Sequence, residues 1–198
     1  MAPSDEQLIR LCRRGDSEAL EELLTRYRNR LMAFIYSVVR DYHLAEDIFQ
    51  ETFLRVYRQA GKFRAGASFK TWLYAIAVNL CRDALRKAKR RPEVSLETET
   101  AGRDGANPRR MADLLAGKAP GPRDEAGGKE MEAILEGEMA GLSREHRQVI
   151  ILSRLEGLKY REIARVLGIP SGTVRSRLHY GLEQLRRGFS ARGIERPG

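Results

Sequence analysis

Apolar residues in the first half of the chain recur at helical spacing. The first stripe follows an i, i+3, i+4, i+7 pattern and consists of Leu20, Leu23, Leu24, Tyr27, Leu31, Phe34, Ile35 and Val38. Asp16 and Ser17 precede it, and both are suitable N-cap residues because their side-chain oxygens accept hydrogen bonds from free N–H groups of the first turn. The pattern predicts a long amphipathic helix that begins near residue 17.

Two further stripes predict two more helices before residue 91. The second helix has one apolar face made of Ile48, Phe49, Thr52, Phe53, Val56 and Tyr57. The third begins near Ser68 and buries Phe69, Trp72, Leu73, Ile76 and Leu80. Alternating runs of β-branched residues do not exceed four or five positions, so strands are not expected.

The second helix also carries a polar stripe opposite its apolar face. Its members fall at i, i+3, i+4, i+7 and i+11 and are Asp47, Gln50, Glu51, Leu54 and Arg58. A stripe of this composition is typical of a solvated helix face, and it is equally compatible with a surface that docks another protein. The residues alone leave both interpretations open.

Helical periodicity returns between residues 131 and 189, and its strongest local pattern is YREIARVLGIPSGTVRSRL at 160–178. We expect a first helix over 160–167, a tight turn at Gly168, which tolerates positive φ, and a second helix that Ser171 caps. Side chains expected to point outward from the second helix are Thr173, Arg175, Ser176, Arg177 and His179. This pattern favours a helix-turn-helix that reads the major groove over a plain helical hairpin with a basic face.

The stretch between the two helical regions differs in composition. Residues 92–130 are rich in Gly, Pro, Ala and scattered charge, and they lack the apolar content needed to offset the entropy of ordering. We therefore predict an all-α fold with two small helical domains, residues 1–91 and 131–190, joined by a flexible linker over 92–130. A helical turn at 111–117 is compatible with this linker.

Charge divides the chain in the same way. The formal net charge is +9, of which residues 1–91 carry +7, residues 92–130 carry −2 and residues 131–198 carry +4. Two basic domains joined by a slightly acidic linker are suited to gripping one polyanion, such as a nucleic acid, at two places. The run RDALRKAKRR at 82–91 extends the predicted third helix; it is either a solvated charge run or a holder of nucleic-acid backbone beside aromatic side chains.

Several classes of function are excluded by what the sequence lacks. Cys12 and Cys81 lie far apart without a CxxC motif, and His43, His146 and His179 are scattered, so neither a metal site nor a disulfide framework is expected. No nucleophile–base pair or Walker loop is present, which argues against an enzyme and against a bound cofactor. No segment reaches 18 apolar residues, and the N-terminus has no apolar signal region. We expect a cytoplasmic protein without membrane insertion.

Two long segments together resemble the extracytoplasmic-function group of the sigma-70 family. The segment DYHLAEDIFQETFLRVYRQAGKFRAGASFKTWLYAIAVNLCRDALRKAKRR is similar to the second conserved region of that family, and LSREHRQVIILSRLEGLKYREIARVLGIPSGTVRSRLHYGLEQLRR is similar to the fourth. They cover about half of the chain, in the order of the family. The chain lacks the first and third regions of the large housekeeping sigma factors, as do the small members of the family.

The resemblance implies a function and roles for individual residues. It implies a non-enzymatic subunit that binds core RNA polymerase through the β′ clamp helices and the β flap, recognises the −10 and −35 elements of promoter DNA, and is held inactive by an anti-sigma factor until a stress signal releases it. The implied polymerase-binding residues are Asp47, Gln50, Glu51 and Leu54. The implied −10 residues are Phe63, Ser68, Trp72, Asn79, Arg82, Arg86, Lys87 and Arg90. The implied −35 residues are Tyr160, Arg161, Ser171, Thr173, Arg175, Ser176, Arg177, His179 and Tyr180.

The chain departs from the family pattern at two of these places. The loop FRAGAS at 63–68 lacks an Asp that many relatives carry, and Tyr180 stands where some relatives carry Arg. Two rival functions remain from other classes. A free-standing transcriptional regulator would bind duplex DNA alone, usually as a dimer, and a nucleic-acid enzyme would need a catalytic cluster that the sequence does not offer.

Overall fold

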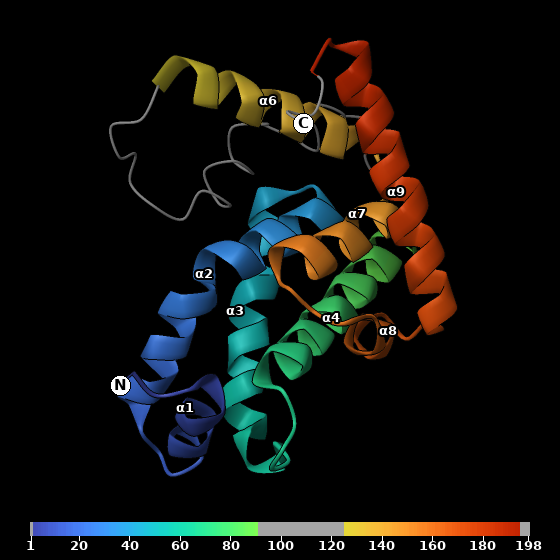
Figure 1. Ribbon diagram of the computed structural model, residues 1–198. Helices are drawn as coiled ribbons and strands as arrows, with labels where there is room; N and C mark the ends of the chain where they lie inside the picture. The colour runs from blue at the N-terminus through green and yellow to red at the C-terminus, as the bar shows by residue number, and fades with distance from the viewer. Residues whose placement is uncertain (1, 91–124, 195–198) are drawn as a thin grey trace.

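The computed structural model describes residues 2–90 and 125–194, which form helices joined by short turns and loops (Figure 1). The N-terminal domain contains α1 (Asp5–Cys12), α2 (Ser17–Val39), α3 (Tyr42–Gln59), the short 3₁₀ turn η1 (Ala60–Lys62) and α4 (Phe69–Arg90). The C-terminal domain contains α6 (Glu125–Gly141), α7 (Arg144–Ile150), the π-helical turn η2 (Ile151–Leu155), α8 (Tyr160–Leu167) and α9 (Ser171–Ala191). The described residues contain no strand, as the sequence predicts.

Side-chain caps fix where the N-terminal helices begin. The N–H of Ala19 donates to Asp16 Oδ1 at 3.1 Å at the start of α2, and the N–H of Leu44 donates to Asp41 Oδ1 at 2.9 Å at the start of α3. Between the two caps α2 ends at Arg40, whose φ of 62° is left-handed. This conformation satisfies an end carbonyl of α2 through the Arg40 N–H and reverses the chain within two residues, so that α3 packs back against α2.

Helix α1 was missed by the sequence analysis, although its signal is present. Ser4 and Gln7 form a capping box, in which the Ser4 N–H donates to Gln7 Oε1 at 2.7 Å and the Gln7 N–H donates to Ser4 Oγ at 3.2 Å. This Ser-x-x-Gln spacing before an apolar pair is a recognised start signal. The N–H of Phe69 donates to Glu6 Oε1 at 3.1 Å, so α1 also holds the start of α4.

The C-terminal domain packs α7 and α8 against the long helix α9. Gly168 ends α8 with a φ of 59°, which confirms the predicted tight turn. Gly181 lets α9 lie close to α7, since a Cβ at this position would come within 2.9 Å of Ile150 Cδ1. The guanidinium of Arg147 is buried and donates to the carbonyl of Met139 at 2.9 Å, which joins α7 to the end of α6.

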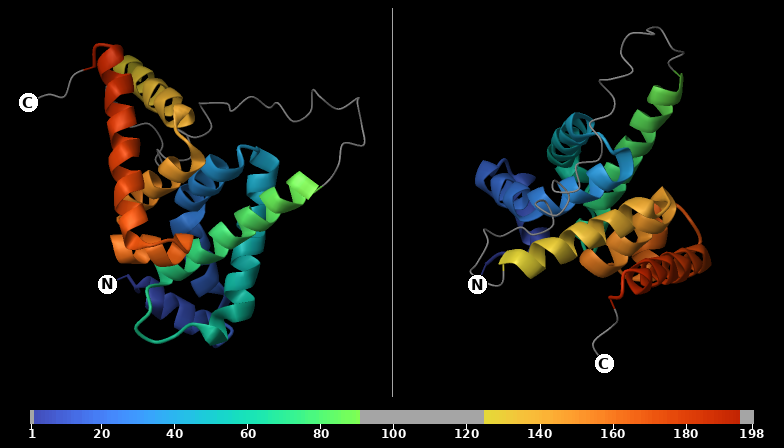
Figure 2. Two further views of the ribbon diagram at one scale, coloured as in Figure 1. Left: turned by 90° about the vertical axis from the view of Figure 1, so that its right-hand side faces the viewer. Right: turned by 90° about the horizontal axis from the view of Figure 1, so that it is seen from above.

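The two domains lie against each other. Helix α8 packs on α4, helix α7 packs on α2, and one continuous cluster of buried apolar side chains includes members of both domains (Figures 1 and 2). The linker predicted over 92–130 falls outside the described residues as far as residue 124, and α6 begins at Glu125, within its expected last residues. The helical turn suggested at 111–117 also lies outside the described residues.

Candidate protein- and nucleic-acid-binding surfaces

The polar stripe of α3 lies on the surface of the N-terminal domain. Asp47, Gln50 and Leu54 are exposed, and Glu51 is half-buried in an ion pair with Arg55 at 2.8 Å. Tyr57 was predicted to face the core, but it is 51% exposed. It lies one turn beyond Leu54, which is 48% exposed, so α3 presents two neighbouring apolar side chains at the end of its polar stripe. Exposed apolar and aromatic side chains beside polar ones are typical of a protein interface, which has an apolar centre and a polar rim.

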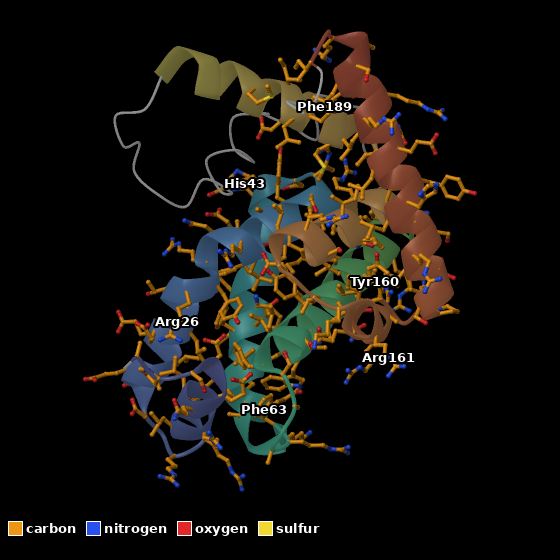
Figure 3. All side chains as sticks on the ribbon, in the orientation of Figure 1. Arg26, His43, Phe63, Tyr160, Arg161 and Phe189 are labelled. Carbon is orange, nitrogen blue, oxygen red and sulfur yellow. The ribbon has the colours of Figure 1, made fainter. Side chains whose placement is uncertain are left out.

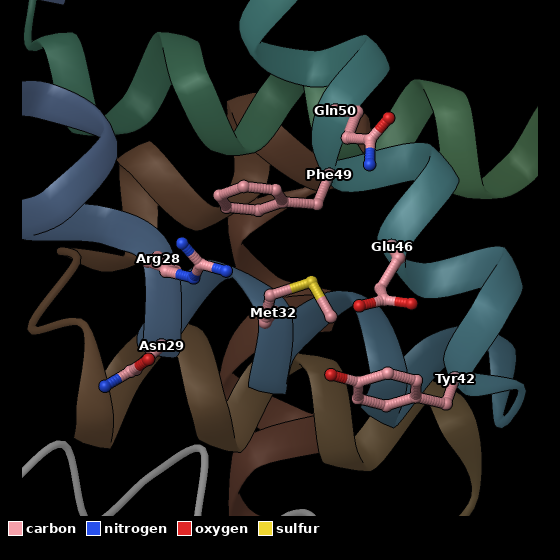
Figure 4. Close-up of a pocket in the computed structure, with 7 residues that line it drawn as sticks. All are labelled: Arg28, Asn29, Met32, Tyr42, Glu46, Phe49 and Gln50. Atoms are coloured by element: carbon pink, nitrogen blue, oxygen red, sulfur yellow. The ribbon is translucent and has the colours of Figure 1, made fainter. Parts of the chain in front are cut away.

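A cavity of about 260 Å³ opens beside this stripe, between α2 and α3 (Figure 4). Its lining residues are Arg28, Asn29, Met32, Tyr42, Glu46, Phe49 and Gln50. Met32 and Phe49 supply apolar surface, while Arg28 and Glu46 supply opposite charges. Gln50 belongs both to the cavity and to the predicted docking stripe, so a partner that lies on α3 can place a side chain in this hollow. Sequence reasoning missed the contribution of α2 because α2 and α3 come together only in the folded chain.

Aromatic side chains gather where the loop at 63–68 meets α4. Phe63 and Trp72 are half-buried, with ring centroids 5.4 Å apart, and Phe69 is buried 6.2 Å from Trp72. Figure 3 shows Phe63 at this end of α4. The Ser68 hydroxyl accepts a hydrogen bond from the Thr71 N–H at 3.2 Å and so caps the helix. The cluster holds the loop against the domain and leaves part of the Phe63 and Trp72 rings exposed.

A hollow of about 390 Å³ follows along α4. Asn79, Arg82, Asp83 and Arg86 line it, which brings together three of the residues predicted to meet the −10 element. Asn79, Arg82 and Arg86 are exposed, although Arg86 pairs with Asp83. Lys87 and Arg90 are also exposed further along the helix. The result is a basic face that continues from the aromatic cluster along one helix, an arrangement suited to a nucleic-acid strand.

The C-terminal domain contains the predicted helix-turn-helix, with α8 as its first helix and α9 as its second. Val174 and Leu178 are buried against the domain. Exposed members of the predicted DNA-binding set are Tyr160, Arg161, Ser171, Arg175, Ser176, His179 and Tyr180, while Thr173 and Arg177 are half-buried. Figure 3 labels Tyr160 and Arg161 at the start of α8. The outward side chains therefore cover the first half of α9 and the start of α8, as reading a major groove requires.

One prediction about the start of α9 is wrong. Ser171 was expected to cap the helix, but the N-cap is Pro170, and no side chain caps the first turn. Pro170 holds an extended backbone with φ −59° and ψ 146°, and this fixed φ lets the helix begin one residue earlier. No side chain therefore bonds the free N–H groups of the first turn, and Ser171 is exposed, so a phosphate can accept hydrogen bonds at this end of the helix.

A buried carboxylate marks the place where the two domains meet. The side chain of Glu156 is 1% exposed, and Lys70 Nζ lies 3.8 Å from its carboxylate. Burial raises the pKa of Glu156, and the attraction of Lys70 lowers it by less. The hydroxyl of the buried Tyr74 and one Glu156 carboxylate oxygen have no hydrogen-bond partner of ordinary geometry. Burial and then the Glu156 charge raise the pKa of Tyr74.

Within the described residues, no cluster of three or more His, Cys, Asp or Glu side chains has the arrangement of a metal site. Over the same residues, no helix combines the length and the apolar character that crossing a membrane requires.

Comparison with known proteins assigns both domains. Residues 23–91 match the family model of sigma-70 region 2, and residues 133–185 match that of sigma-70 region 4. The chain is 34% identical over 179 residues to the extracytoplasmic-function RNA polymerase sigma factor SigW of Bacillus subtilis, which covers 90% of this chain and 93% of SigW. It is 32% identical to the sigma-E factor of Haemophilus influenzae, with 92% of this chain and 93% of that factor covered.

Solved structures share the fold. CnrH in complex with the cytosolic domain of CnrY superposes with a TM-score of 0.63 at 20% identity, over 94% of this chain and 97% of CnrH. The sigma factor RpoE of Bartonella quintana, in complex with the anti-sigma factor NepR, superposes with a TM-score of 0.60 at 22% identity, over 86% of this chain and 94% of RpoE. The two region matches and the similarity to curated factors along nearly the whole chain show that this protein belongs to the extracytoplasmic-function group of the sigma-70 family.

Proposed function

We propose that this protein binds core RNA polymerase and directs it to promoters whose −10 and −35 elements are read by different domains of the chain. The observation that carries the proposal is the exposed helix-turn-helix face of α9, which belongs to the same chain as the aromatic and basic surface of α4. Two DNA-binding surfaces of different chemistry on one small chain suit a factor that recognises two separate promoter elements.

Core polymerase is proposed to dock on the α3 stripe and the adjoining cavity. The exposure of Asp47, Gln50 and Leu54 supports this assignment, since a docking residue must be accessible in the free protein. The mixture of exposed apolar and acidic side chains supports it further. Apolar surface supplies affinity at the centre of an interface, and charge sets the orientation of the partner.

The −10 element is proposed to be captured as single-stranded DNA at the start of α4. The partly exposed rings of Phe63 and Trp72 offer surfaces on which an unstacked base can stack. Asn79 carries both a donor and an acceptor that can read a base edge. The exposed cations Arg86, Lys87 and Arg90 would hold the phosphates of the same strand.

The −35 element is proposed to be read as duplex by α9. Arg175 reaches outward from the helix, and a guanidinium can bind the O6 and N7 atoms of guanine through two hydrogen bonds. Ser176 and His179 lie on the same exposed face and would contact neighbouring base edges. Tyr160 and Arg161 at the start of α8 would contact phosphates and so fix the register of the helix in the groove.

We also propose that an anti-sigma factor controls this protein. CnrH and RpoE, which share the fold, were solved in complex with CnrY and with the anti-sigma factor NepR respectively. A purified anti-sigma partner of this protein should prevent its binding to core polymerase without itself binding promoter DNA.

Run-off transcription on fragmented genomic DNA of the source organism tests the proposed function. Core RNA polymerase with this protein should initiate at new start sites that share one pair of −35 and −10 sequences, and core polymerase alone should not. An absence of protein-dependent start sites, combined with tight binding of the protein alone to duplex DNA, would contradict the proposal and favour a free-standing regulator.

A further inference from the structure

The end of α1 carries cations that the proposed function does not use. Arg10, Arg13 and Arg14 fall at i, i+3 and i+4, so they share one side of the helix and of the turn that follows it. All three are exposed, while the apolar side of α1 is buried in the N-terminal domain. In the turn, the Arg14 N–H donates to the Leu11 carbonyl at 2.8 Å, and Gly15 takes a left-handed φ of 91°. The backbone therefore holds the three arginines on a defined surface.

Two more cations come to the same end of the N-terminal domain from a distant part of the chain. Lys62 ends η1, Arg64 lies two residues further on, and both are exposed. Helix α1 packs against η1 and against the start of α4. Figure 1 and the left view of Figure 2 show this end of the domain on the side away from α6. Phe63, on which we propose that a −10 base stacks, lies between Lys62 and Arg64 in the sequence.

These five cations form the α1–η1 patch, which consists of Arg10, Arg13, Arg14, Lys62 and Arg64. Within residues 2–90 and 125–194, no ion pair or side-chain hydrogen bond involves any of them. Cations at the end of a helix also offset the helix dipole, but this explanation covers α1 alone and leaves the two cations beside η1 without a role. Five like charges that are close together repel one another, and a polyanion that binds them relieves this repulsion and releases counterions.

Carboxylates near the patch are occupied by other groups. Asp5 pairs with Arg26 at 2.9 Å. Glu6 accepts the N–H at the start of α4, and Asp16 accepts an N–H of the first turn of α2. These contacts fix the local fold and leave the charge of the patch available to a partner.

The patch lies at the opposite end of the aromatic cluster from the basic face of α4. Asn79 follows Phe69 by ten residues, which places it about 15 Å along the helix from the cluster, and α4 ends at Arg90. Beyond Arg90 the chain leads to the C-terminal domain, which we propose reads the −35 element upstream. A strand that runs from the basic face of α4 across Phe63 and Trp72 therefore comes to the α1–η1 patch on the downstream side of the −10 element.

We propose that the α1–η1 patch binds the phosphates of the DNA strand immediately downstream of the −10 element. The inference rests on the proposed function, because the direction of the strand follows from the domains that we assign to the two elements. Contacts to phosphates carry no sequence preference. The patch would add affinity for the melted strand and hold it in place after the bases of the −10 element are captured, whatever sequence follows them.

Replacing Arg13 and Arg14 together by alanine tests the patch in holoenzyme assembled from core RNA polymerase and the full chain. Two labelled single strands carry the −10 sequence of the non-template strand; the short probe ends there, and the long probe continues to the start site. Fluorescence anisotropy should show that the variant binds the long probe about tenfold more weakly than the wild type at roughly 0.1 M salt. The short probe should bind equally well to both.

Salt dependence sharpens the same measurement. Each phosphate of a single strand contributes about 0.7 to the slope of log affinity against log salt concentration, so the slope for the long probe should fall by about 1.4 in the variant. Arg13→Lys with Arg14→Lys should retain most of the affinity, since Lys also binds phosphate as a point charge.

A matched control removes two adjacent arginines elsewhere. Arg186→Ala with Arg187→Ala changes an exposed part of α9 and should bind both probes as the wild type does, because neither probe carries a −35 element. Thermal unfolding should be the same for the Arg13→Ala, Arg14→Ala variant and the wild type, since both side chains are exposed. Equal binding of the long probe by variant and wild type would overturn the patch, and so would an equal loss for both probes.

A further arm separates failure of the patch from failure of the proposed function. Wild-type holoenzyme that binds the −10 probes no better than scrambled strands would reject the proposed function. The patch is then decided by the free protein on mixed-sequence single-stranded DNA, where the alanine variant should bind more weakly and with a smaller salt slope. Equal DNA affinity, together with loss of binding to phosphatidylglycerol vesicles in the variant, would overturn the proposal and assign the patch to a membrane surface.

Discussion

The two domains present the side chains that we propose bind DNA in different states. In the N-terminal domain, Phe63 and Trp72 pack on one another and Arg82 is hydrogen-bonded, so the surface is largely preformed and partly covered. In the C-terminal domain, Arg175 and His179 extend from α9 into solvent. A rigid aromatic platform suits unstacked single-stranded bases, and side chains that extend from one helix suit the groove of an intact duplex. The contrast indicates that binding single-stranded bases calls for rigidly packed aromatic rings, whereas binding a duplex groove calls for side chains that extend from a helix.

The largest expected effect concerns the N-terminal domain. Asp47→Arg reverses a charge on the exposed α3 stripe, where we place polymerase binding, and should weaken binding to core polymerase ~100-fold or more, because a buried interface charge would face a mismatched partner. Fluorescence anisotropy with labelled protein measures the affinity. Glu21→Arg makes the same change on an exposed part of α2 and should bind normally. Equal affinity in Asp47→Arg would remove α3 from the interface.

The next largest effect tests whether the −35 and −10 elements are recognised by different domains. Arg175→Ala should lose about 1–3 kcal/mol of discrimination at one base pair of the −35 element and keep the −10 preference of the wild type. Asn79→Ala should do the reverse. Initiation on promoter libraries randomised at one element at a time measures both preferences, with Arg186→Ala, exposed further along α9, as the control. A change in both preferences from either variant would show that the domains do not read independently.

A third prediction concerns how the C-terminal domain supports α9, the helix that we propose reads the −35 element. Gly181→Ala adds a Cβ within 2.9 Å of Ile150 Cδ1 and 3.1 Å of His146 Cβ, so it should lower the free energy of unfolding by about 1–2 kcal/mol after the helical preference of alanine is counted. Gly172→Ala, with nothing within 4 Å of the added Cβ, should be neutral or stabilising. Urea denaturation measures both. A stable Gly181→Ala variant would mean that α7 and α9 can move apart freely.

The smallest expected effect is a dependence of the contact between the two domains on pH. Burial raises the pKa of Glu156 more than Lys70 lowers it, so protonation of this carboxyl favours the contact between the domains. The added stability of the contact is complete below the pKa that Glu156 has when the domains are apart, and it is lost as pH rises through the raised pKa. Tyr74 and the cations Lys70 and Arg30 are the groups of the N-terminal domain that act on the Glu156 carboxyl.

Scattering measurements between pH 7 and pH 5 check this prediction. The average radius of gyration should decrease modestly as pH falls in the wild type and should stay constant in Glu156→Gln, which retains the shape of the side chain without its titration. A decrease of equal size in the variant would assign the effect to other groups, such as the histidines.

Local patterns predicted each domain well because they depend on neighbours in sequence. The cap at Asp16, the turn at Gly168 and the buried faces of α2 and α4 follow from periodicity and from backbone preferences that a few residues determine. Tyr57 was placed wrongly for a related reason. Helical spacing gives the direction of a side chain, but whether another helix covers that direction near the end of α3 depends on the tertiary structure.

Features that join distant segments could not be predicted. The cavity at Met32 and Phe49, and the burial of Glu156 against Lys70, bring together residues from different helices or domains. A Glu between helices is most often exposed, and no local pattern marks this one as buried. The start of α9 is a smaller case, since Pro170 and Ser171 both suit a helix start and the structure selects Pro170 as the cap.

The burial of both cysteines also determines how the chain responds to oxidants and to thiol reagents. Cys12 and Cys81 are free and buried, and burial raises the pKa of Cys81 to about 12 and also raises that of Cys12. The thiolate is the reactive form, so near neutral pH the folded protein should resist peroxide and maleimides. A cysteine introduced at any exposed site would then be the preferred point of attachment for a fluorophore, and the native chain needs no prior removal of its own thiols.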